Sequence, residues 1–222
     1  MFIVIEGVDA AGKATQSKML AERFKKQGRE VALHSFPRYE TPLGEVILRH
    51  LKGRTAMMEM HIRDSSDMEI DGETVYHKAK EDPLAFQCLM LADKYDAACE
   101  IEHQINEGMI VVADRWAPSA ICYGAADGLS MDWLMRTQSF LIKPDFCIYI
   151  EVSPEVALQR RPKMRDRYEK DREKQRSVRE HYDRLWDMMR ESSLHTNSHW
   201  CRIDGNRTIE EVHEQVWKVV GG

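Results

Sequence analysis

Apolar runs along the chain predict a parallel sheet. Continuous apolar runs at residues 2–5, 109–113 and 146–152 are typical of strands that are buried on both faces of such a sheet. Shorter runs at residues 31–36 and 200–203 predict two further strands. The pattern therefore predicts about five parallel strands.

Amphipathic stretches separate these runs. Their helical periodicity predicts helices over residues 14–27, 42–51, 84–107, 130–141, 170–192 and 209–220, with a further helix starting at Ser153-Pro154-Glu155. Strands that alternate with helices in this way predict an α/β fold, with helices on both faces of the sheet. No linker or internal repeat divides the chain, so a single domain over residues 1–222 is expected.

The composition is that of a globular chain that buries one core. Of the 222 residues, 43% are hydrophobic and 31% are charged, with a formal net charge of −5. This charge gives no overall footprint for nucleic acid, and the one densely basic stretch, residues 160–179, is interleaved with acids. No apolar run approaches the roughly 20 residues that span a bilayer, and a core strand at the start leaves no room for a cleavable signal. Five scattered cysteines indicate a reducing compartment, so the cytoplasm is the expected location.

A phosphate-binding loop follows the first apolar run. Gly7 and Gly12-Lys13 have the spacing at which backbone N–H groups wrap phosphates, and the N-terminus of the next helix adds a partial positive charge. Lys13 would reach the β- and γ-phosphates. The alternative is a glycine-rich turn with a solvated lysine. The residues expected to bind the donor nucleotide are Gly7, Ala10, Ala11, Gly12, Lys13, Ala14 and Thr15.

Ala14 stands where such loops normally carry a Ser or Thr that ligates Mg²⁺. The metal would then be held through waters, and the candidate carboxylates are Asp9, Asp114 and Glu169. Thr15 remains able to bond an α-phosphate oxygen. The same departure leaves open a nucleotide-binding regulatory protein that has lost turnover.

Two more candidate positions follow the carboxyl ends of predicted strands, the edge of a parallel sheet where ligands bind. Arg38, after the second strand, is a candidate phosphate-binding fork, with a solvated surface arginine as the alternative. Asp114 and Arg115 follow the strand at residues 109–113. The acid is placed to reach the metal, as in the second Walker element, and the arginine to reach an anion in the same crevice. The alternative for Asp114 is a cap of the next turn.

Two segments interrupt the alternation of predicted strands and helices. Residues 52–81 show partial alternation around a Ser-Ser-Asp turn and predict an inserted excursion or β-hairpin, to which no chemistry is assigned. Residues 160–169 are strongly basic and are interrupted by Pro162. They indicate a lid that carries cations to a transferring phosphoryl group, with a solvated charged linker as the alternative.

Together these motifs resemble the thymidylate kinase family of P-loop nucleoside monophosphate kinases. The resemblance extends along the whole chain, and its strength lies in several motifs occurring together. The motifs are Ile5-Glu6-Gly7-Val8-Asp9 with Gly12-Lys13-Ala14-Thr15-Gln16, Phe36-Pro37-Arg38-Tyr39, Asp114-Arg115-Trp116 with Ser119 and Tyr123, Lys143-Pro144-Asp145, Val152-Ser153-Pro154-Glu155-Val156-Ala157-Leu158, and Arg167-Tyr168-Glu169. The resemblance implies a three-layer P-loop NTPase fold, Mg-ATP as phosphoryl donor, and a cytoplasmic homodimer.

The resemblance also implies roles for individual residues. Asp9 would lie near the acceptor sugar and the metal, Arg115 would hold the acceptor monophosphate, and Tyr123 would lie over the deoxyribose. Because Ala10 and Ala11 place no arginine in the loop, the cations would come from the lid, where Arg160, Arg161, Arg165 and Arg167 are the candidates. The implied catalytic residues are Lys13, Asp9, Arg38, Arg115, Arg160 and Arg167. The implied acceptor site contains Asp9, Phe36, Arg38, Met90, Lys94, Arg115, Ser119, Tyr123 and Tyr168.

The base pocket departs from the family's pattern. In the family an aromatic residue stacks on the pyrimidine, and an arginine four residues later bonds its O4, whereas Met90 and Lys94 stand at these positions here. Ala120 stands where an Asn or Ser often addresses the base. The expected reaction is transfer of the γ-phosphoryl group of ATP to dTMP or to a close analogue, such as a 5-substituted deoxyuridylate. The alternatives are a kinase for a different nucleotide or nucleoside, and a regulatory protein without turnover.

Overall fold

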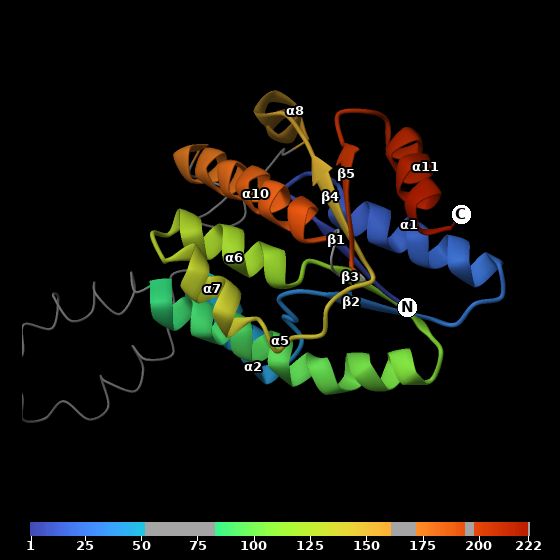
Figure 1. Cartoon of the computed structure of the whole chain (residues 1–222), viewed down its shortest axis with the longest axis horizontal. Coiled ribbons are helices and arrows are strands. Elements are labelled where there is room, and N and C mark those ends of the chain that lie inside the picture. The colour runs from blue at the N-terminus through green and yellow to red at the C-terminus, as the bar shows by residue number, and fades with distance from the viewer. Residues whose placement is uncertain (52–82, 161–171, 194–197, 222) are drawn as a thin grey trace, which may run out of the picture.

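The computed structural model describes residues 1–51, 83–160, 172–193 and 198–221 (Figure 1). The predicted excursion at residues 52–81 lies outside the described residues. Most of the predicted lid lies outside them as well, including the candidates Arg161, Arg165, Arg167, Tyr168 and Glu169.

Within the described residues, five parallel strands form one sheet in the order β2-β3-β1-β4-β5. The central strand, β1, pairs with β3 on one side and with β4 on the other. Its five residues are all buried, as a strand covered by helices on both faces requires. The predicted parallel sheet is therefore confirmed, and its strands are β1 (Phe2–Glu6), β2 (Val31–Ser35), β3 (Ile110–Asp114), β4 (Phe146–Glu151) and β5 (His199–Asp204).

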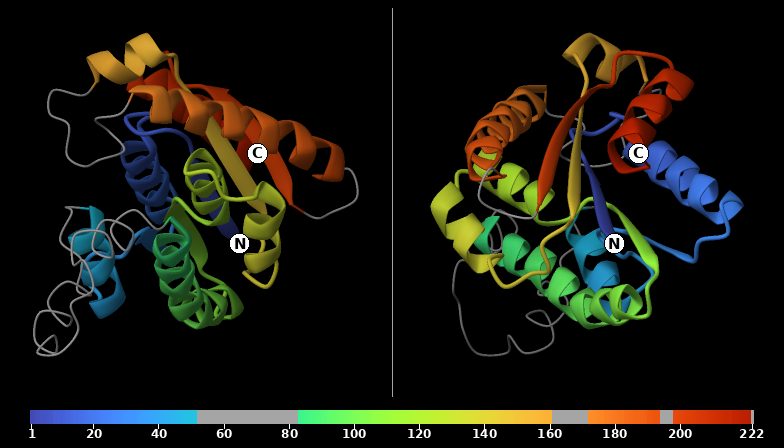
Figure 2. Two further views of the ribbon diagram at one scale, coloured as in Figure 1. Left: turned by 90° about the vertical axis from the view of Figure 1, so that its left-hand side faces the viewer. Right: turned by 45° about the vertical axis from the view of Figure 1, so that its right-hand side comes forward.

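Helices cover both faces of this sheet (Figure 2). The helices α1 (Lys13–Lys26) and α11 (Ile209–Val220) pack together on one face. The other face carries α5 (Pro83–Asn106), α6 (Ala117–Ala126) and α10 (Arg172–Ser193), and shorter helices are α2 (Pro42–Leu51), α7 (Met131–Thr137) and α8 (Pro154–Gln159). None of the described helices is long and apolar enough to cross a membrane.

The alternation of side chains along β1 supplies both halves of the core. Phe2 and Val4 belong to one buried cluster with Ile101 of α5, whereas Ile5 belongs to a second cluster with Leu20 of α1. Because the strands are parallel, the loops that follow β1, β2, β3 and β4 all leave from the same edge of the sheet. The core thus places the phosphate-binding loop and the other strand-end motifs beside one another.

Most helix bounds agree with the sequence prediction. Those of α2 and α11 are confirmed, and Ser153 caps α8 by accepting a hydrogen bond from the Val156 amide at 3.3 Å. The helix predicted over residues 130–141 starts after Ser130 as expected but ends at Thr137. There, the hydroxyls of Thr137 and Ser139 donate to backbone carbonyls at 2.9 and 2.8 Å and favour a turn.

Helix α6 was not predicted. Its sequence, APSAICYGAA, consists mostly of small apolar residues, and seven of its ten positions are buried. A helix of this kind has no polar face, so the sequence shows no amphipathic period there.

Gly44 controls how closely α2 approaches the loop after β2. Thr41 caps α2, because its hydroxyl accepts a hydrogen bond from the Gly44 amide at 3.1 Å. A Cβ at residue 44 would overlap the Arg38 carbonyl oxygen and would lie 2.8 Å from the Tyr39 Cα. The absence of a side chain at Gly44 therefore lets the backbone that carries Arg38 pack directly on the helix.

We expect Gly44→Ala to lower the free energy of unfolding by about 3 kcal/mol, because both partners in the overlap are backbone atoms that cannot rotate away. Gly128→Ala is the matched control. Gly128, unlike the helical Gly44, has a left-handed φ of 92°, and nothing lies within 4 Å of the added Cβ, so only the conformational cost of about 1 kcal/mol applies. Urea denaturation measures both variants, and equal losses would contradict the close approach at Gly44.

Candidate active site

The loop from Gly7 to Gly12 turns sharply between β1 and α1. Gly7, Ala10 and Gly12 have positive φ values of 146°, 60° and 96°. A Cβ at Gly7 would lie 2.6 Å from the Ile150 carbonyl oxygen, so the loop passes β4 too closely for any side chain. A left-handed alanine costs about 1 kcal/mol, which the surrounding structure must offset. Such a succession of backbone conformations curves N–H groups into a concavity that binds anions.

Lys13 starts α1 beneath this loop. Its side chain is buried, and its Nζ donates to the Val8 carbonyl of the loop at 2.8 Å. Ala14 and Thr15 are exposed on the first turn of α1. The predicted phosphate-binding elements therefore occur together: a curved loop, a helix N-terminus and a lysine held against the loop.

Arg115 joins the loop to α6. It follows β3 with a positive φ of 72°, which is unusual for a residue other than glycine. One guanidinium nitrogen donates to the Gly7 carbonyl at 3.4 Å and to Ser119 Oγ at 3.1 Å. The other forms an ion pair with Asp9 and donates to the Tyr123 hydroxyl at 3.3 Å. Five predicted site residues, Gly7, Asp9, Arg115, Ser119 and Tyr123, are thus brought together.

Asp9 uses both carboxylate oxygens within this group. One oxygen pairs with Arg115, and the other accepts a hydrogen bond from Gln175 Nε2 at 3.0 Å. Gln175 lies on α10 and was not singled out in the sequence, where it is one polar residue in a strongly charged helix. The contact with Asp9 connects α10 to the phosphate-binding loop.

Asp114 ends β3 one residue before Arg115. Its Oδ1 is buried and has no hydrogen-bond partner within the described residues, which leaves it able to accept from a metal-bound water. Among the described residues, no three His, Cys, Asp or Glu side chains gather into a metal site. A buried carboxylate oxygen with a free lone pair fits a Mg²⁺ ion that keeps several of its waters.

Arg38 is held firmly beside α5. Its Nε donates to Asp93 Oδ1 at 2.9 Å, and its Nη2 donates to Asp96 Oδ2 at 2.6 Å and to the Asp93 carbonyl at 2.9 Å. Partial burial disfavours the charged form, but the hydrogen bonds to Asp96 and Asp93 outweigh it and raise the pKa of Arg38. Its neighbour Phe36 is 3% exposed and packs edge to face on Trp116, with ring centroids 4.9 Å apart.

Lys94 is buried within α5 rather than reaching the surface. The side chain is almost fully inaccessible, and its Nζ donates to the Met90 carbonyl at 3.0 Å. Burial is the main cause that lowers the pKa of Lys94 from 10.5 to about 8, and the Arg115 charge adds to it against the opposing effects of Asp93 and Glu6. Met90 is half-buried on α5 and Ala120 is buried on α6, so the three residues that depart from the family's base pocket lie on two helices that contact each other.

Arg160 is the one predicted lid arginine among the described residues. It caps the end of α8, and its Nη2 donates to the Arg207 carbonyl at 3.1 Å. The structure therefore places it between α8 and the loop that follows β5, while the other lid candidates lie outside the described residues.

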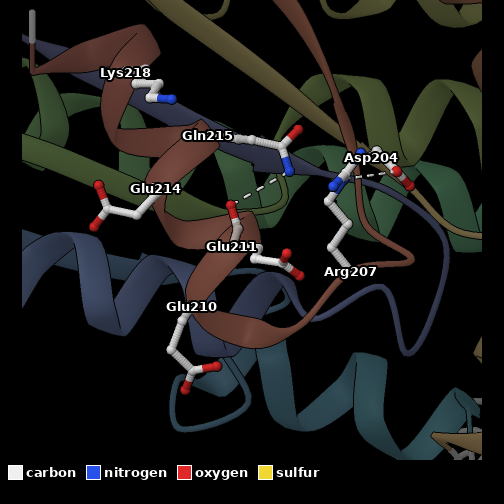
Figure 3. Close-up of a pocket in the computed structure, with 7 residues that line it drawn as sticks. All are labelled: Asp204, Arg207, Glu210, Glu211, Glu214, Gln215 and Lys218. Carbon is white, nitrogen blue, oxygen red and sulfur yellow. Dashed lines mark hydrogen bonds and ion pairs between the residues drawn. The ribbon is translucent and has the colours of Figure 1, made fainter.

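A separate surface depression lies between the end of β5 and α11 (Figure 3). Its lining contains more acids than bases, which disfavours the phosphates of a nucleotide. No residue of the phosphate-binding loop reaches it, so the candidate active site is the strand-end cluster instead. The depression is lined by Asp204, Arg207, Glu210, Glu211, Glu214, Gln215 and Lys218.

Comparison with known proteins identifies one family throughout. The sequence profile described as thymidylate kinase matches residues 5–63 and 71–216. A probable thymidylate kinase from Thermococcus kodakarensis is 32% identical over 97% of this chain and 95% of its own. The thymidylate kinase of Plasmodium falciparum is 32% identical over 99% of this chain and 89% of its own. The solved thymidylate kinase of Candida albicans has the same fold, with a TM-score of 0.75, 22% identity, and coverage of 99% of this chain and 90% of that one.

The buried charge on Lys94 leads to a prediction about stability. The folded state loses this proton near pH 8 and the unfolded chain near 10.5, so between these values the unfolded state binds more protons and the stability of the protein rises with pH. We expect Lys94→Met to raise the free energy of unfolding by about 2 kcal/mol at pH 7, because the cost of the buried charge disappears. This advantage should shrink as the pH rises from 8 to 10.5.

Denaturant titrations of both proteins at several pH values measure this difference. Lys18→Met, at an exposed position of α1, is the matched control and should show no such trend. A variant that is less stable than the parent at pH 7, or a difference that is constant with pH, would contradict the cost assigned to Lys94.

Proposed function

The chain belongs to the thymidylate kinase family, and from this premise we propose that it transfers the γ-phosphoryl group of ATP to the 5′-phosphate of dTMP or of a close pyrimidine analogue. The family is one of ATP-dependent phosphotransferases, so the chain is an enzyme of that class. The observation that carries the proposal is the position of Arg115. Its guanidinium contacts the donor loop through Gly7 and Asp9 and the acceptor side through Ser119 and Tyr123.

Phosphoryl transfer between two phosphates mainly requires positioning and neutralisation of charge. We assign the donor phosphates to the loop N–H groups, the N-terminus of α1 and Lys13. The attacking oxygen of the acceptor phosphate is already an anion, so the site needs no general base. The bond formed joins an oxygen of the acceptor phosphate to the γ-phosphorus, and the bond broken joins that phosphorus to the oxygen that bridges it to the β-phosphate. ADP is therefore the leaving group, and its negative charge would be stabilised by the loop that binds its phosphates.

The acceptor phosphate is assigned to Arg115 and Arg38. Asp93 and Asp96 fix the Arg38 guanidinium on α5, which reduces the entropy lost when it binds an anion. The Arg115 guanidinium lies within 5.1 Å of the Tyr123 ring centroid, and this ring would cover the deoxyribose. Phe36 packs on the buried ring of Trp116 and in this way supports the acceptor side of the site from the core.

Asp114 is the residue we assign to Mg²⁺, with Asp9 as a contributor through water. When bound, the ion would help to neutralise the charge of the donor phosphates. Because Ala14 offers no hydroxyl, the buried and unpartnered Asp114 Oδ1 is the described ligand atom that best suits a metal-bound water. Glu169 remains a further candidate from outside the described residues.

Three finer features complete the proposal. Arg160 and Arg167 would bring positive charge from the lid, since Ala10 and Ala11 leave the loop without an arginine. Tyr168 would contribute to the acceptor site from the same segment. The active form would be a homodimer in the cytoplasm, as the resemblance implied.

The test is the release of ADP from Mg-ATP with dTMP, dUMP, 5-hydroxymethyl-dUMP, dCMP, UMP, GMP, AMP, thymidine or no acceptor. We expect turnover with dTMP or a 5-substituted analogue and none with thymidine, because Arg115 and Arg38 need an acceptor phosphate. Preference for a purine nucleotide or a nucleoside would overturn the assigned substrate. Binding of ATP without turnover on any acceptor would indicate the regulatory protein instead.

The buried Lys94 leads to a prediction about base preference. A lysine is a point donor that lacks the two-pronged geometry of arginine, so it distinguishes a 4-oxo from a 4-amino pyrimidine weakly. We expect Lys94→Arg to raise the ratio of kcat/KM for dTMP to that for dCMP about tenfold. Lys18→Arg, at an exposed site, is the control. An unchanged ratio would remove Lys94 from the base pocket.

A further inference from the structure

Glu6 is a carboxylate with no access to solvent. It ends β1 directly before the phosphate-binding loop, and its exposed fraction is 0%. Burying a charged carboxylate is costly unless hydrogen bonds replace its lost water. The mechanism proposed above gives this residue no role.

Four hydrogen bonds reach Glu6 from two helices, three from the start of α6 and one from α10. Oε1 accepts from the Trp116 amide at 2.6 Å and from the Ser119 amide at 3.4 Å. Oε2 accepts from Ser119 Oγ at 2.6 Å and from the Tyr182 hydroxyl of α10 at 2.8 Å. All four donors are neutral groups, and together they saturate both oxygens.

The first two bonds make Glu6 the N-terminal cap of α6. Trp116 is the N-cap residue, and its own side chain makes no capping hydrogen bond. The amides of Trp116 and Ser119 are among the unsatisfied donors at the start of a helix, where a negative charge is also favoured by the helix dipole. A strand residue therefore supplies the cap that the helix sequence lacks, and this fixes the start of α6 relative to the phosphate-binding loop.

The bond between Ser119 Oγ and Glu6 Oε2 sets the direction of the hydroxyl proton of Ser119. Its hydroxyl donates to Glu6 Oε2, so its lone pairs face Arg115, whose Nη1 donates to Ser119 Oγ at 3.1 Å. The Tyr182 hydroxyl lies 2.9 Å from the same Oγ. If Glu6 were neutral and donated to Ser119 instead, the hydroxyl hydrogen would compete with the Arg115 N–H.

We propose that Glu6 is a positioning residue for the acceptor phosphate. It holds Arg115 in place through Ser119 and the capped end of α6, and it brings Tyr182 of α10 to the same point. Glu6 itself touches no substrate. The inference rests on the proposed function, since it presumes that Arg115 binds the acceptor.

The test is Glu6→Gln, which keeps the size of the side chain and removes its charge and one of its acceptor oxygens. We expect the KM for the acceptor nucleotide to rise about tenfold, as for loss of hydrogen bonds to a charged group, while the KM for ATP changes less than twofold. In an Arg115→Met background, Glu6→Gln should have almost no further effect on the acceptor KM, because both changes remove the same interaction. Thermal unfolding is recorded for each variant.

A matched pair of tyrosines separates positioning from packing. Tyr182 and Tyr149 stack with their ring centroids 5.1 Å apart, but only the Tyr182 hydroxyl bonds Glu6 among the described contacts. Tyr182→Phe should raise the acceptor KM about threefold, as for loss of one hydrogen bond, and Tyr149→Phe should leave it unchanged. If Glu6→Gln does not fold, the comparison of Tyr182→Phe with Tyr149→Phe tests the proposal by itself.

The outcomes distinguish the two proposals. Equal changes in both KM values, a loss of thermal stability alone, or additive effects of Glu6→Gln and Arg115→Met would each overturn the role of Glu6 and leave the proposed function standing. A parent protein that phosphorylates no acceptor would overturn the proposed function. In that case calorimetric binding of dTMP to the parent and to Glu6→Gln decides the role of Glu6, and unchanged affinity rejects it.

Discussion

Burial of charge at the carboxyl edge of the sheet is the constraint on which the site depends. Glu6, Lys94 and Arg115 lie at or near the ends of β1 and β3 or on the helix that covers them, and each is largely withdrawn from water. Such groups are tolerated only where hydrogen bonds and opposite charges compensate them. The compensation comes from different elements, which ties the loop, α5, α6 and α10 into one arrangement. In the proposed function, the same arrangement sets the positions of the substrates' phosphates.

The sequence predicted the elements whose pattern is local. A buried strand, a glycine-rich loop and an amphipathic helix each have their own signature, so β1, the phosphate-binding loop and α11 were predicted with close bounds. Helix α6 has no amphipathic signature, because nearly all of it is covered by neighbouring helices and by β1 through Glu6. Its start is defined by a residue that lies 110 positions earlier in the chain. A local pattern contains no information about such a cap.

The residues of the candidate site also divide into those that a sequence pattern predicts and those that depend on packing. Arg38, Asp114 and Arg115 were predicted because they follow strands, and a parallel sheet brings strand ends together. Gln175 and Tyr182 were not predicted, because they lie within a long charged helix where neither residue interrupts the period. Their role depends on the packing of α10 against α6, which the sequence alone does not specify. The one available signal was at Glu6, where a single acid ends an otherwise apolar run.

Asp93 and Lys94 are neighbours in α5, yet the proposed function assigns them to different halves of the acceptor nucleotide. Asp93 fixes Arg38, which is assigned to the acceptor phosphate. Lys94 donates to the Met90 carbonyl and is one of the residues assigned to the base. A small rotation or shift of α5 would therefore disturb both contacts at once. Under the proposed function, a change of base preference is therefore expected from exchange of individual side chains such as Met90, Lys94 or Ala120, and not from movement of the helix. On that assignment, the substrate range would diverge in small mutational steps while Asp93 continues to hold Arg38.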